Sequence, residues 1–334
     1  MGPVPLLSTT WDRADVLGAL RVRCGFGRGD YRIEPGLYAV GTPDETSLVL
    51  ATANYKLSVD HLRRALHGRS VWVLVVDTKG INVWCAAGKG TFSTDEVVAR
   101  VQATRLAELL PGGTLILPQL AGPGVDAAAV GRATGLRVLW GPVRAADLPA
   151  FLDSGLRASR AARTVSFALV ERAVLLPMEL RQILPRALAV AAVLVLTAGL
   201  NPGGFSSVLM LTHGFVAALV WLSAVLVGTA LVVLALPWLP GRSFSFRGAW
   251  AGALLCGLAA LAGLRHPALT GSSYTVAAWC LVVPAAVSFT ALLFTGATPL
   301  TSPSGVEREM GRALPVQAVA SLLAAVLWLL GRVG

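Results

Sequence analysis

The chain has 334 residues, of which 55% are hydrophobic and 14% are charged, and its mean hydropathy is +0.68. This composition is too apolar for an ordinary soluble protein of this length, so part of the chain is expected to lie in a membrane. The formal net charge of +10 is not accompanied by a lysine/arginine block or an aromatic-basic RNA motif. It therefore argues for a basic face beside anionic lipid and against nucleic-acid binding.

The front of the chain predicts an α/β fold. Residues 1–47 contain several glycines and Pro35, which interrupt long elements, so turns and short strands are expected there. From residue 48 to 141, short β-branched runs alternate with helical stretches, the pattern of βαβ units and a largely parallel sheet. The expected strands are 48–52, 71–76, 114–117 and 137–140, and the expected helices are 58–67, 93–110 and 125–134. Ser93 and Glu96 predict a capping box at the start of the second helix.

Each expected strand is followed by a loop rich in polar residues and glycine. These loops are 53–56, 77–82, 118–124 and 141–144. In open α/β sheets, ligands bind outside the carboxyl ends of the strands. The loops are therefore the expected ligand edge of the first domain.

The back of the chain predicts a membrane domain. Residues 166–182 mix apolar and charged side chains, as an amphipathic linker helix at a membrane surface would. Five apolar stretches follow, at about 183–200, 211–238, 247–264, 274–296 and 313–331, each near the ~20 residues needed to cross a bilayer. The predicted division is a domain at 1–165, the linker at 166–182 and five transmembrane helices within 183–334.

The short loops between these stretches predict an orientation. Arg242 and Arg247 flank the second connection, and Arg308 and Arg312 flank the fourth. By the positive-inside rule, the N-terminal domain is expected in the cytoplasm and the C-terminus outside the inner membrane. No charged residue lies near the centre of a stretch, which favours anchoring or docking over ion transport.

Four cysteines, Cys24, Cys85, Cys256 and Cys280, contain no C-x-x-C pair, so no iron–sulfur cluster is expected in this chain. Cys256 and Cys280 fall inside apolar stretches and are expected to act as small hydrophobic residues. Cys85 differs, because it follows the strand 71–76 and lies near the start of a short helix that Asn82 is expected to cap.

Two interpretations of Cys85 follow from its position. A helix N-terminus with lysines nearby favours the thiolate, which is the form that binds metals. A packed core cysteine beside Trp84 is the alternative. A nucleotide phosphate loop is excluded, because that pattern needs glycine at Val83 and serine or threonine at Gly90.

The run Asn82–Lys89, with the sequence NVWCAAGK, resembles the motif of the HgcA-type membrane corrinoid proteins of mercury methylation. The resemblance extends to residues 52–57, 77–81, 118–120 and 141–145, and to the five apolar stretches. The first domain is also similar to the corrinoid domain of the corrinoid iron–sulfur protein of acetyl-CoA synthesis. The resemblance implies a Rossmann-like α/β domain that binds cobalamin or a related corrinoid, followed by an all-α five-helix transmembrane domain.

The resemblance also implies roles for individual residues. Cys85 is implied as the catalytic residue and the axial ligand of cobalt. The residues expected to bind the cofactor are Thr52, Asn54, Thr78, Gly80, Asn82, Trp84, Cys85, Ala86, Ala87, Gly88, Lys89, Gln119 and Arg144.

The implied activity is a corrinoid-dependent methyltransferase that passes a methyl group from a methylated folate or its methyltransferase to Hg(II). Because the chain lacks an iron–sulfur site, a ferredoxin-like electron donor of the HgcB type is implied as a partner, beside the lipid bilayer. Two alternatives remain open: a membrane-anchored methyl carrier for another acceptor or for one-carbon metabolism, and a transporter or receptor with a cytoplasmic ligand domain.

Overall fold

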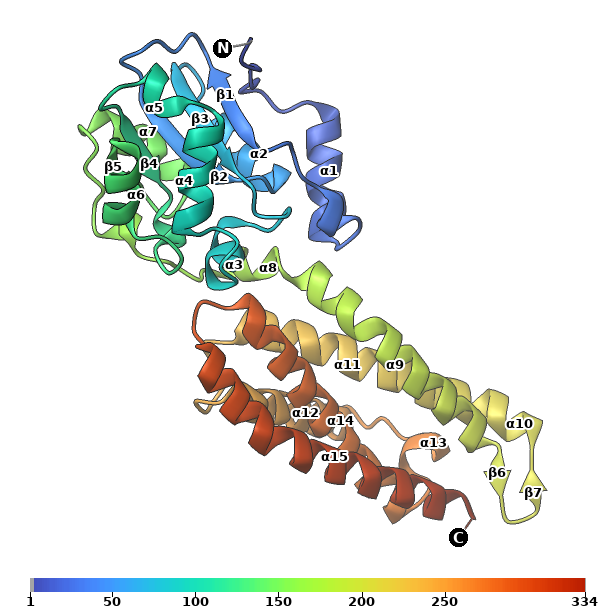
Figure 1. Ribbon diagram of the computed structural model, residues 1–334. Coiled ribbons are helices and arrows are strands. Elements are labelled where there is room, and N and C mark those ends of the chain that lie inside the picture. Colours follow the sequence, from blue (N-terminus) through green and yellow to red (C-terminus); the bar gives the residue numbers. More distant parts are fainter. Residues whose placement is uncertain (1–2, 334) are drawn as a thin grey trace. The chain divides into compact units, whose positions relative to one another are not determined.

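The structure is a computed structural model that describes residues 3–333. The chain divides into two compact units, Met1–Ser166 and Phe167–Gly334. The first unit is an α/β domain built on a mixed sheet, and the second is a set of helices (Figure 1).

The sheet of the first unit has five strands in the order β1-β3-β2-β4-β5. They are β1 (Gly36–Val40), β2 (Val49–Ala53), β3 (Val71–Val76), β4 (Thr114–Leu117) and β5 (Arg137–Trp140). Strands β2 to β5 pair in parallel, which confirms the four predicted strands, whereas β1 pairs antiparallel with β3. All six residues of β3 are buried, as expected for a strand covered on both faces.

Helices α2 (Lys56–Ala65), α4 (Thr94–Ala103) and α6 (Ala127–Thr134) connect the parallel strands. The predicted helix 93–110 is wrong in one respect, because it is broken. Arg105 adopts a left-handed φ of 53°, and a separate short helix, α5 (Leu106–Leu109), follows it. The predicted capping box is only half formed. The Ser93 hydroxyl accepts from the Glu96 N–H at 3.2 Å, but the Glu96 carboxylate accepts instead from the Asp77 N–H at 3.1 Å.

The first unit begins with α1 (Arg13–Arg23), a helix where only turns and short strands were expected. Asp12 and Asp15 cap it reciprocally, at 2.7 and 3.1 Å. The other elements of this unit are η1 (Arg28–Asp30), α3 (Val83–Gly88), η2 (Gln119–Ala121), η3 (Ala145–Asp147), α7 (Leu148–Asp153) and η4 (Ala161–Arg163).

The second unit contains five helical segments that are long and apolar enough to cross a membrane. They are Leu169–Ala198, Ser207–Ala235, Phe244–Leu261, Ser273–Ala297 and Ser304–Val333. Their elements are α8 (Leu169–Ala173), α9 (Leu176–Ala198), α10 (Ser207–Leu209), the π-helical turn η5 (Met210–Gly214), α11 (Phe215–Ala235), α12 (Phe244–Leu261), α14 (Ser273–Phe294), η6 (Thr295–Ala297) and α15 (Pro303–Val333). A hairpin of β6 (Leu200–Asn201) and β7 (Gly204–Phe205), and the short α13 (Pro267–Thr270), connect them.

The segment expected to form a separate surface linker is continuous with the first of these helical segments. Residues 169–182 form α8 and the first turns of α9, where Pro177 stands at the helix start. Arg172 is 3% exposed. Its guanidinium donates to the backbone oxygens of Phe167 at 2.8 Å and Leu234 at 3.0 Å, so this segment packs into the helical unit.

Helices α12 and α14 approach each other closely through small residues. A Cβ added to Gly248 would lie 2.5 Å from the Val287 oxygen, and one added to Gly252 would lie 2.5 Å from the Pro284 Cα. Gly248 and Gly252 are one turn apart, and their partners step backwards along α14. The two helices therefore run antiparallel in close backbone contact, the arrangement that small residues permit in membranes.

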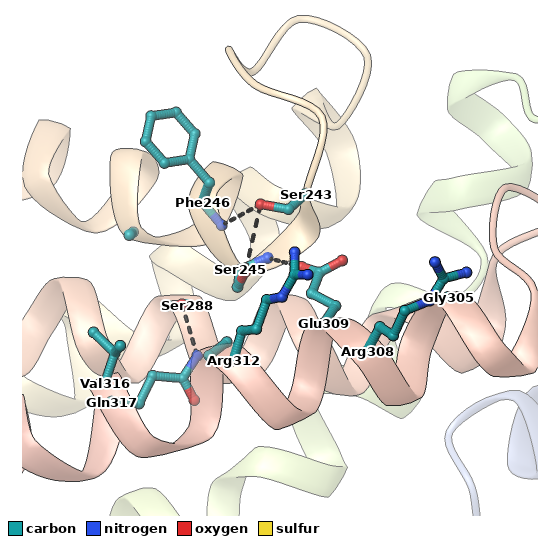
Figure 2. Close-up of a pocket in the computed structure, with 12 residues that line it drawn as sticks. Ser243, Ser245, Phe246, Ser288, Gly305, Arg308, Glu309, Arg312, Val316 and Gln317 are labelled. Atoms are coloured by element: carbon teal, nitrogen blue, oxygen red, sulfur yellow. Dashed lines mark hydrogen bonds between the residues drawn. The ribbon is translucent and has the colours of Figure 1, made fainter.

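A pocket of about 560 Å³ that contains several polar side chains lies among α12, α14 and α15 (Figure 2). The Glu309 carboxylate accepts from the Ser245 N–H at 2.6 Å, in the first turn of α12. Deeper in the unit, the Gln317 amide donates to the Ser288 hydroxyl at 2.7 Å. Both contacts join one helix to another, so these polar groups fix the packing of the helical unit.

Candidate functional site

The ends of β2 and β3 are joined by a buried hydrogen-bond network around Asn54. Its side-chain oxygen accepts from the Thr78 N–H at 3.1 Å, the Thr78 hydroxyl at 2.8 Å and the Gly80 N–H at 2.9 Å. Asn54 is 2% exposed and Thr78 is fully buried. These two predicted site residues therefore use their polar groups to shape the loop that follows β3.

The loop after β3 makes a tight reversal. Lys79 and Gly80 have left-handed φ values of 56° and 74°, and the Lys79 N–H donates to the Asp77 carboxylate at 3.0 Å. A side chain at Gly80 would also come within 3.0 Å of the Gly29 oxygen. Glycine is the residue that tolerates both this conformation and this close approach. The reversal leads the chain directly into α3.

Helix α3 presents Cys85 in its first turn. The Asn82 side-chain oxygen accepts from the Cys85 N–H at 2.9 Å, which confirms the predicted cap. Ala86 and Ala87 are buried, whereas Trp84 is 36% exposed and Cys85 is half-buried. The helix is thus anchored by its small residues, and the thiol lies at its partly accessible side.

The loop after β4 packs closely against the end of α3. Gly124 lies so close that a Cβ on it would be 2.3 Å from the Phe92 oxygen and 3.0 Å from the Ala87 oxygen. The turn η2 also lies against α3. The loops after β3 and β4 therefore meet at α3, and Asn54 joins the end of β2 to them, at the carboxyl edge of the parallel strands. The supporting role of Gly124 depends on a contact between distant segments, and the sequence alone gave no sign of it.

The remaining predicted site residues have separate environments. Thr52 is buried within β2, and Gly88 and Lys89 form the exposed end of α3. Gln119 accepts from the Arg163 guanidinium at 2.8 Å, and Arg144 hydrogen-bonds the Ser166 hydroxyl. Gln119 and Arg144 are thus both tied to the segment that ends the first unit.

This edge has charged side chains but lacks a cluster of metal-binding side chains among the described residues. Within residues 3–333, no three His, Cys, Asp or Glu side chains form a group that could hold a metal ion. A polar cavity of about 390 Å³ lies between the loop after β3 and the start of α4. It is lined by Asp77, Lys79, Gly90, Thr91, Ser93, Asp95, Glu96 and Ala99.

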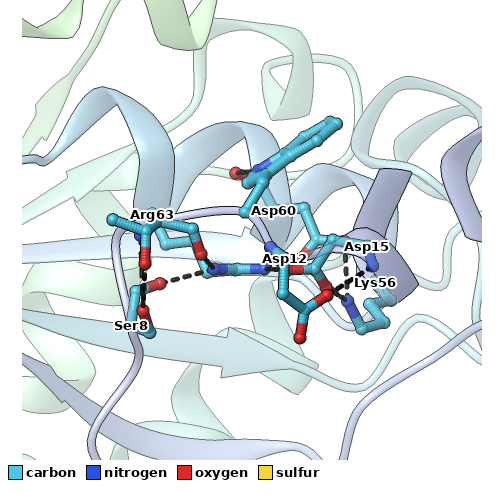
Figure 3. Close-up of polar contacts among 8 residues, drawn as sticks. Ser8, Asp12, Asp15, Lys56, Asp60 and Arg63 are labelled. Atoms are coloured by element: carbon cyan, nitrogen blue, oxygen red, sulfur yellow. Dashed lines mark hydrogen bonds and ion pairs between the residues drawn. The ribbon is translucent and has the colours of Figure 1, made fainter. Parts of the chain in front are cut away.

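A second cluster of charged side chains lies between α1 and α2 (Figure 3). The Asp15 carboxylate pairs with Lys56 at 2.6 Å and Arg63 at 2.5 Å, while Asp60 pairs with Lys56 and Arg63 at 2.8 Å each. Burial alone would raise the pKa of Asp15, but the hydrogen bonds from Lys56 and Arg63 outweigh it and hold that pKa well below its usual range. Since the charges satisfy one another, this cluster attaches α1 to the domain.

Residues 10–152 match the family model described as the CO dehydrogenase/acetyl-CoA synthase delta subunit. Curated relatives are acetyl-CoA decarbonylase/synthase complex gamma subunits. The one from Methanopyrus kandleri is 33% identical over 131 residues, which are 38% of this chain and 27% of the relative. The one from Methanothermobacter thermautotrophicus is 29% identical over 144 residues, which are 42% of this chain and 31% of the relative.

The family match lies within the α/β unit and ends before the helical unit begins. The matched part spans less than a third of the length of either relative. The family similarity therefore concerns the α/β unit.

Proposed function

We propose that this chain is a membrane-anchored, corrinoid-dependent methyltransferase in which Cys85 would hold the cobalt through its thiolate. The observation that carries the proposal is the placement of Cys85 in the Asn82-capped first turn of α3, at the carboxyl edge of the sheet. Relatives of this α/β unit are subunits of complexes that make or break acetyl-CoA. Corrinoid proteins of such complexes carry methyl groups, which supports methyl transfer as the general activity.

The residues present fit a corrinoid. A corrin ring supplies four nitrogen ligands to its cobalt, so one protein donor is enough, and a half-buried thiol at a helix start is a suitable donor. The face of α3 beside the thiol is open, because a Cβ on Gly88 or Gly90 would meet no atom within 4 Å. A flat ring therefore has room to approach this end of the helix.

When bound, the corrinoid supplies a cobalt that accepts a methyl group and passes it to an acceptor. The residues of this chain hold and orient it. Cys85 would hold the cobalt through its thiolate, Asn82 fixes the helical turn that carries the thiol, and Gly124 lets the loop after β4 pack against the end of α3. Asn54 and Thr78 would act indirectly, because their hydrogen bond shapes the loop that leads into α3.

The thiolate ligand supports Hg(II) as the acceptor. A thiolate is a soft, electron-rich ligand, and it favours transfer of the methyl group together with its bonding electron pair. Mercury(II) is a soft electrophile suited to such a group. We place the α/β unit in the cytoplasm, with a methylated folate or its methyltransferase as donor and a ferredoxin-like iron–sulfur protein as reductant.

The proposal is tested with the purified full-length protein, loaded with corrinoid and methylated. Addition of Hg(II) is expected to give methylmercury, and Cys85→Ala is expected to abolish it. Cys24→Ser, which removes a thiol at the end of α1, serves as the matched control and should retain the activity. Equal methylmercury formation by Cys85→Ala and the unmodified protein would refute the role of Cys85.

A second candidate is a methyl carrier for a carbon acceptor, which the names of the acetyl-CoA decarbonylase/synthase relatives favour. The same methylated protein distinguishes the two. A carrier of this kind would keep its methyl group in the presence of Hg(II), whereas the mercury-methylating protein would lose it at a rate that rises with Hg(II) concentration.

A further inference from the structure

Cys256 on α12 and Cys280 on α14 lie one helical turn beyond the close contacts of Gly248 and Gly252. Gly248 packs against Ser288, and Gly252 packs against Pro284. One more turn along α12 reaches Cys256, and one more turn back along α14 reaches Cys280, since four residues make about one helical turn. The antiparallel register thus brings together two thiols that were expected to be unrelated small hydrophobic residues.

The side chains confirm this register. The two cysteines line the same cavity in the helical unit. The Cys256 thiol also lies 3.8 Å from the backbone oxygen of Trp279, the residue before Cys280. Both cysteines are free, with Cys256 half-buried and Cys280 exposed on the helical unit. Two free thiols from neighbouring helices therefore lie at one cavity.

Both thiols line one cavity of about 160 Å³. Its other lining residues are apolar, apart from the Thr270 hydroxyl and the Trp279 indole, and none is His, Asp, Glu, Lys or Arg. Zinc sites need about four ligands, usually from Cys, His or carboxylates, and this cavity offers two. Two thiol ligands instead suit a soft cation that forms stable two-coordinate complexes with thiolates.

We propose that Cys256 and Cys280 form a dithiolate site for a soft, two-coordinate metal cation, with Hg(II) as its cargo. Binding forms two sulfur–mercury bonds, and the two thiol protons leave to solvent, so no oxidant or reductant is consumed. The binding site itself is independent of the corrinoid. Its use as a store of substrate for methylation rests on the function proposed above.

The binding test uses the full-length protein in detergent, free of corrinoid, with Cys24→Ser and Cys85→Ala removing the other two thiols. After reduction, the protein is loaded with Hg(II) and passed through a column in excess 2-mercaptoethanol. The paired thiols are expected to retain one Hg(II) per chain and to release two protons per ion, because the second thiol binds intramolecularly. Cys256→Ser or Cys280→Ser is expected to lower the retained mercury at least tenfold.

A matched control keeps the number of thiols and moves one of them. In Cys280→Ser/Val282→Cys, the second thiol lies two residues along α14, about 200° around the helix. This protein should retain as little mercury as the single-thiol variants. Equal retention by the relocated and the paired protein would show that the thiols bind separately, and would overturn the proposal, as would the absence of retention by the paired protein.

The role as a substrate store has its own readout. In the corrinoid-loaded protein, Cys256→Ser should slow methylmercury formation several-fold at limiting Hg(II) and leave it unchanged at saturating Hg(II). Slowing at every concentration would contradict a storage role. Because the binding test contains no corrinoid, its failure is distinguishable from failure of the proposed methyltransferase activity.

Discussion

The side-chain oxygen of Asn82 lies 2.9 Å from the backbone nitrogen of Cys85 and accepts its hydrogen bond. This contact closes the first turn of α3, a helix of only six residues. Helices this short are not stable alone, so the cap and the packing of Ala86 and Ala87 hold the turn together. The position of the thiol therefore depends on Asn82.

Replacement of Asn82 by Ala should loosen the turn that carries Cys85. Loss of a capping side chain costs about 1 kcal/mol. Amide hydrogen exchange of residues 83–91 should accelerate, while exchange in β3 stays unchanged. Asn82→Asp, which keeps an acceptor oxygen at the cap, is the control, and it should protect these amides nearly as well as Asn82 does.

Gly124→Ala should displace α3 from its support. The new Cβ would lie 2.3 Å from the Phe92 oxygen, so the backbone must move, at a cost of roughly 1–3 kcal/mol. Urea unfolding of the full chain should show the loss. Gly88→Ala adds the same atom where none lies within 4 Å, and a similar loss in that variant would rule out the steric explanation.

Thr78→Val should destabilise the loop after β3, although the volume of the side chain is nearly unchanged. The buried hydroxyl lies 2.8 Å from the Asn54 side-chain oxygen and 2.7 Å from the Ile81 oxygen. A buried acceptor that loses its donor costs about 1–3 kcal/mol. Thr78→Ser keeps the hydroxyl and should cost less in urea unfolding; the reverse order would show that the methyl group matters more.

The charged cluster of Asp15, Lys56, Asp60 and Arg63 predicts an acid-dependent stability. Because the pKa of Asp15 is held below its usual range, the folded state binds this proton less readily than the unfolded state. The stabilisation is complete above the ordinary carboxyl pKa of about 4 and is lost as pH falls through the folded value. Asp15→Asn should cost roughly 3 kcal/mol at neutral pH.

The difference in stability between wild type and Asp15→Asn should therefore decrease as the pH is lowered. Urea midpoints measured by circular dichroism from pH 7 downward are expected to converge below about pH 4. A difference that stays constant with pH would show that the ionised carboxylate is not the source of the stabilisation.

The strands of the sheet were predictable because their β-branched runs are long and continuous. Strand β2 was expected at 48–52 and lies at Val49–Ala53, and β3 lies where it was expected. Helix α1 was missed, because its apolar periodicity is weak and much of its stability comes from ion pairs with α2, 41 and 48 residues away. Such long-range charge pairing is not visible in one sequence.

In the candidate site, too, local features were predictable from the sequence and long-range contacts were not. The Asn82 cap was predictable, since it is local and a helix start favours asparagine. The hydrogen bonds of Asn54 and the close approach of Gly124 to α3 depend on loops from different strands. Likewise, the shared cavity of Cys256 and Cys280 depends on the register of α12 against α14.

The role of Cys85 as the cobalt ligand is tested most directly by visible absorption spectroscopy of the corrinoid-loaded, full-length protein. The spectra of wild type and Cys85→Ala are compared at equal cobalt content. If the Cys85 thiolate holds the metal, the spectrum of the variant will shift relative to wild type, while Cys24→Ser will leave it unchanged. Superimposable spectra of wild type and Cys85→Ala, at one cobalt per chain in each, would contradict Cys85 as the cobalt ligand.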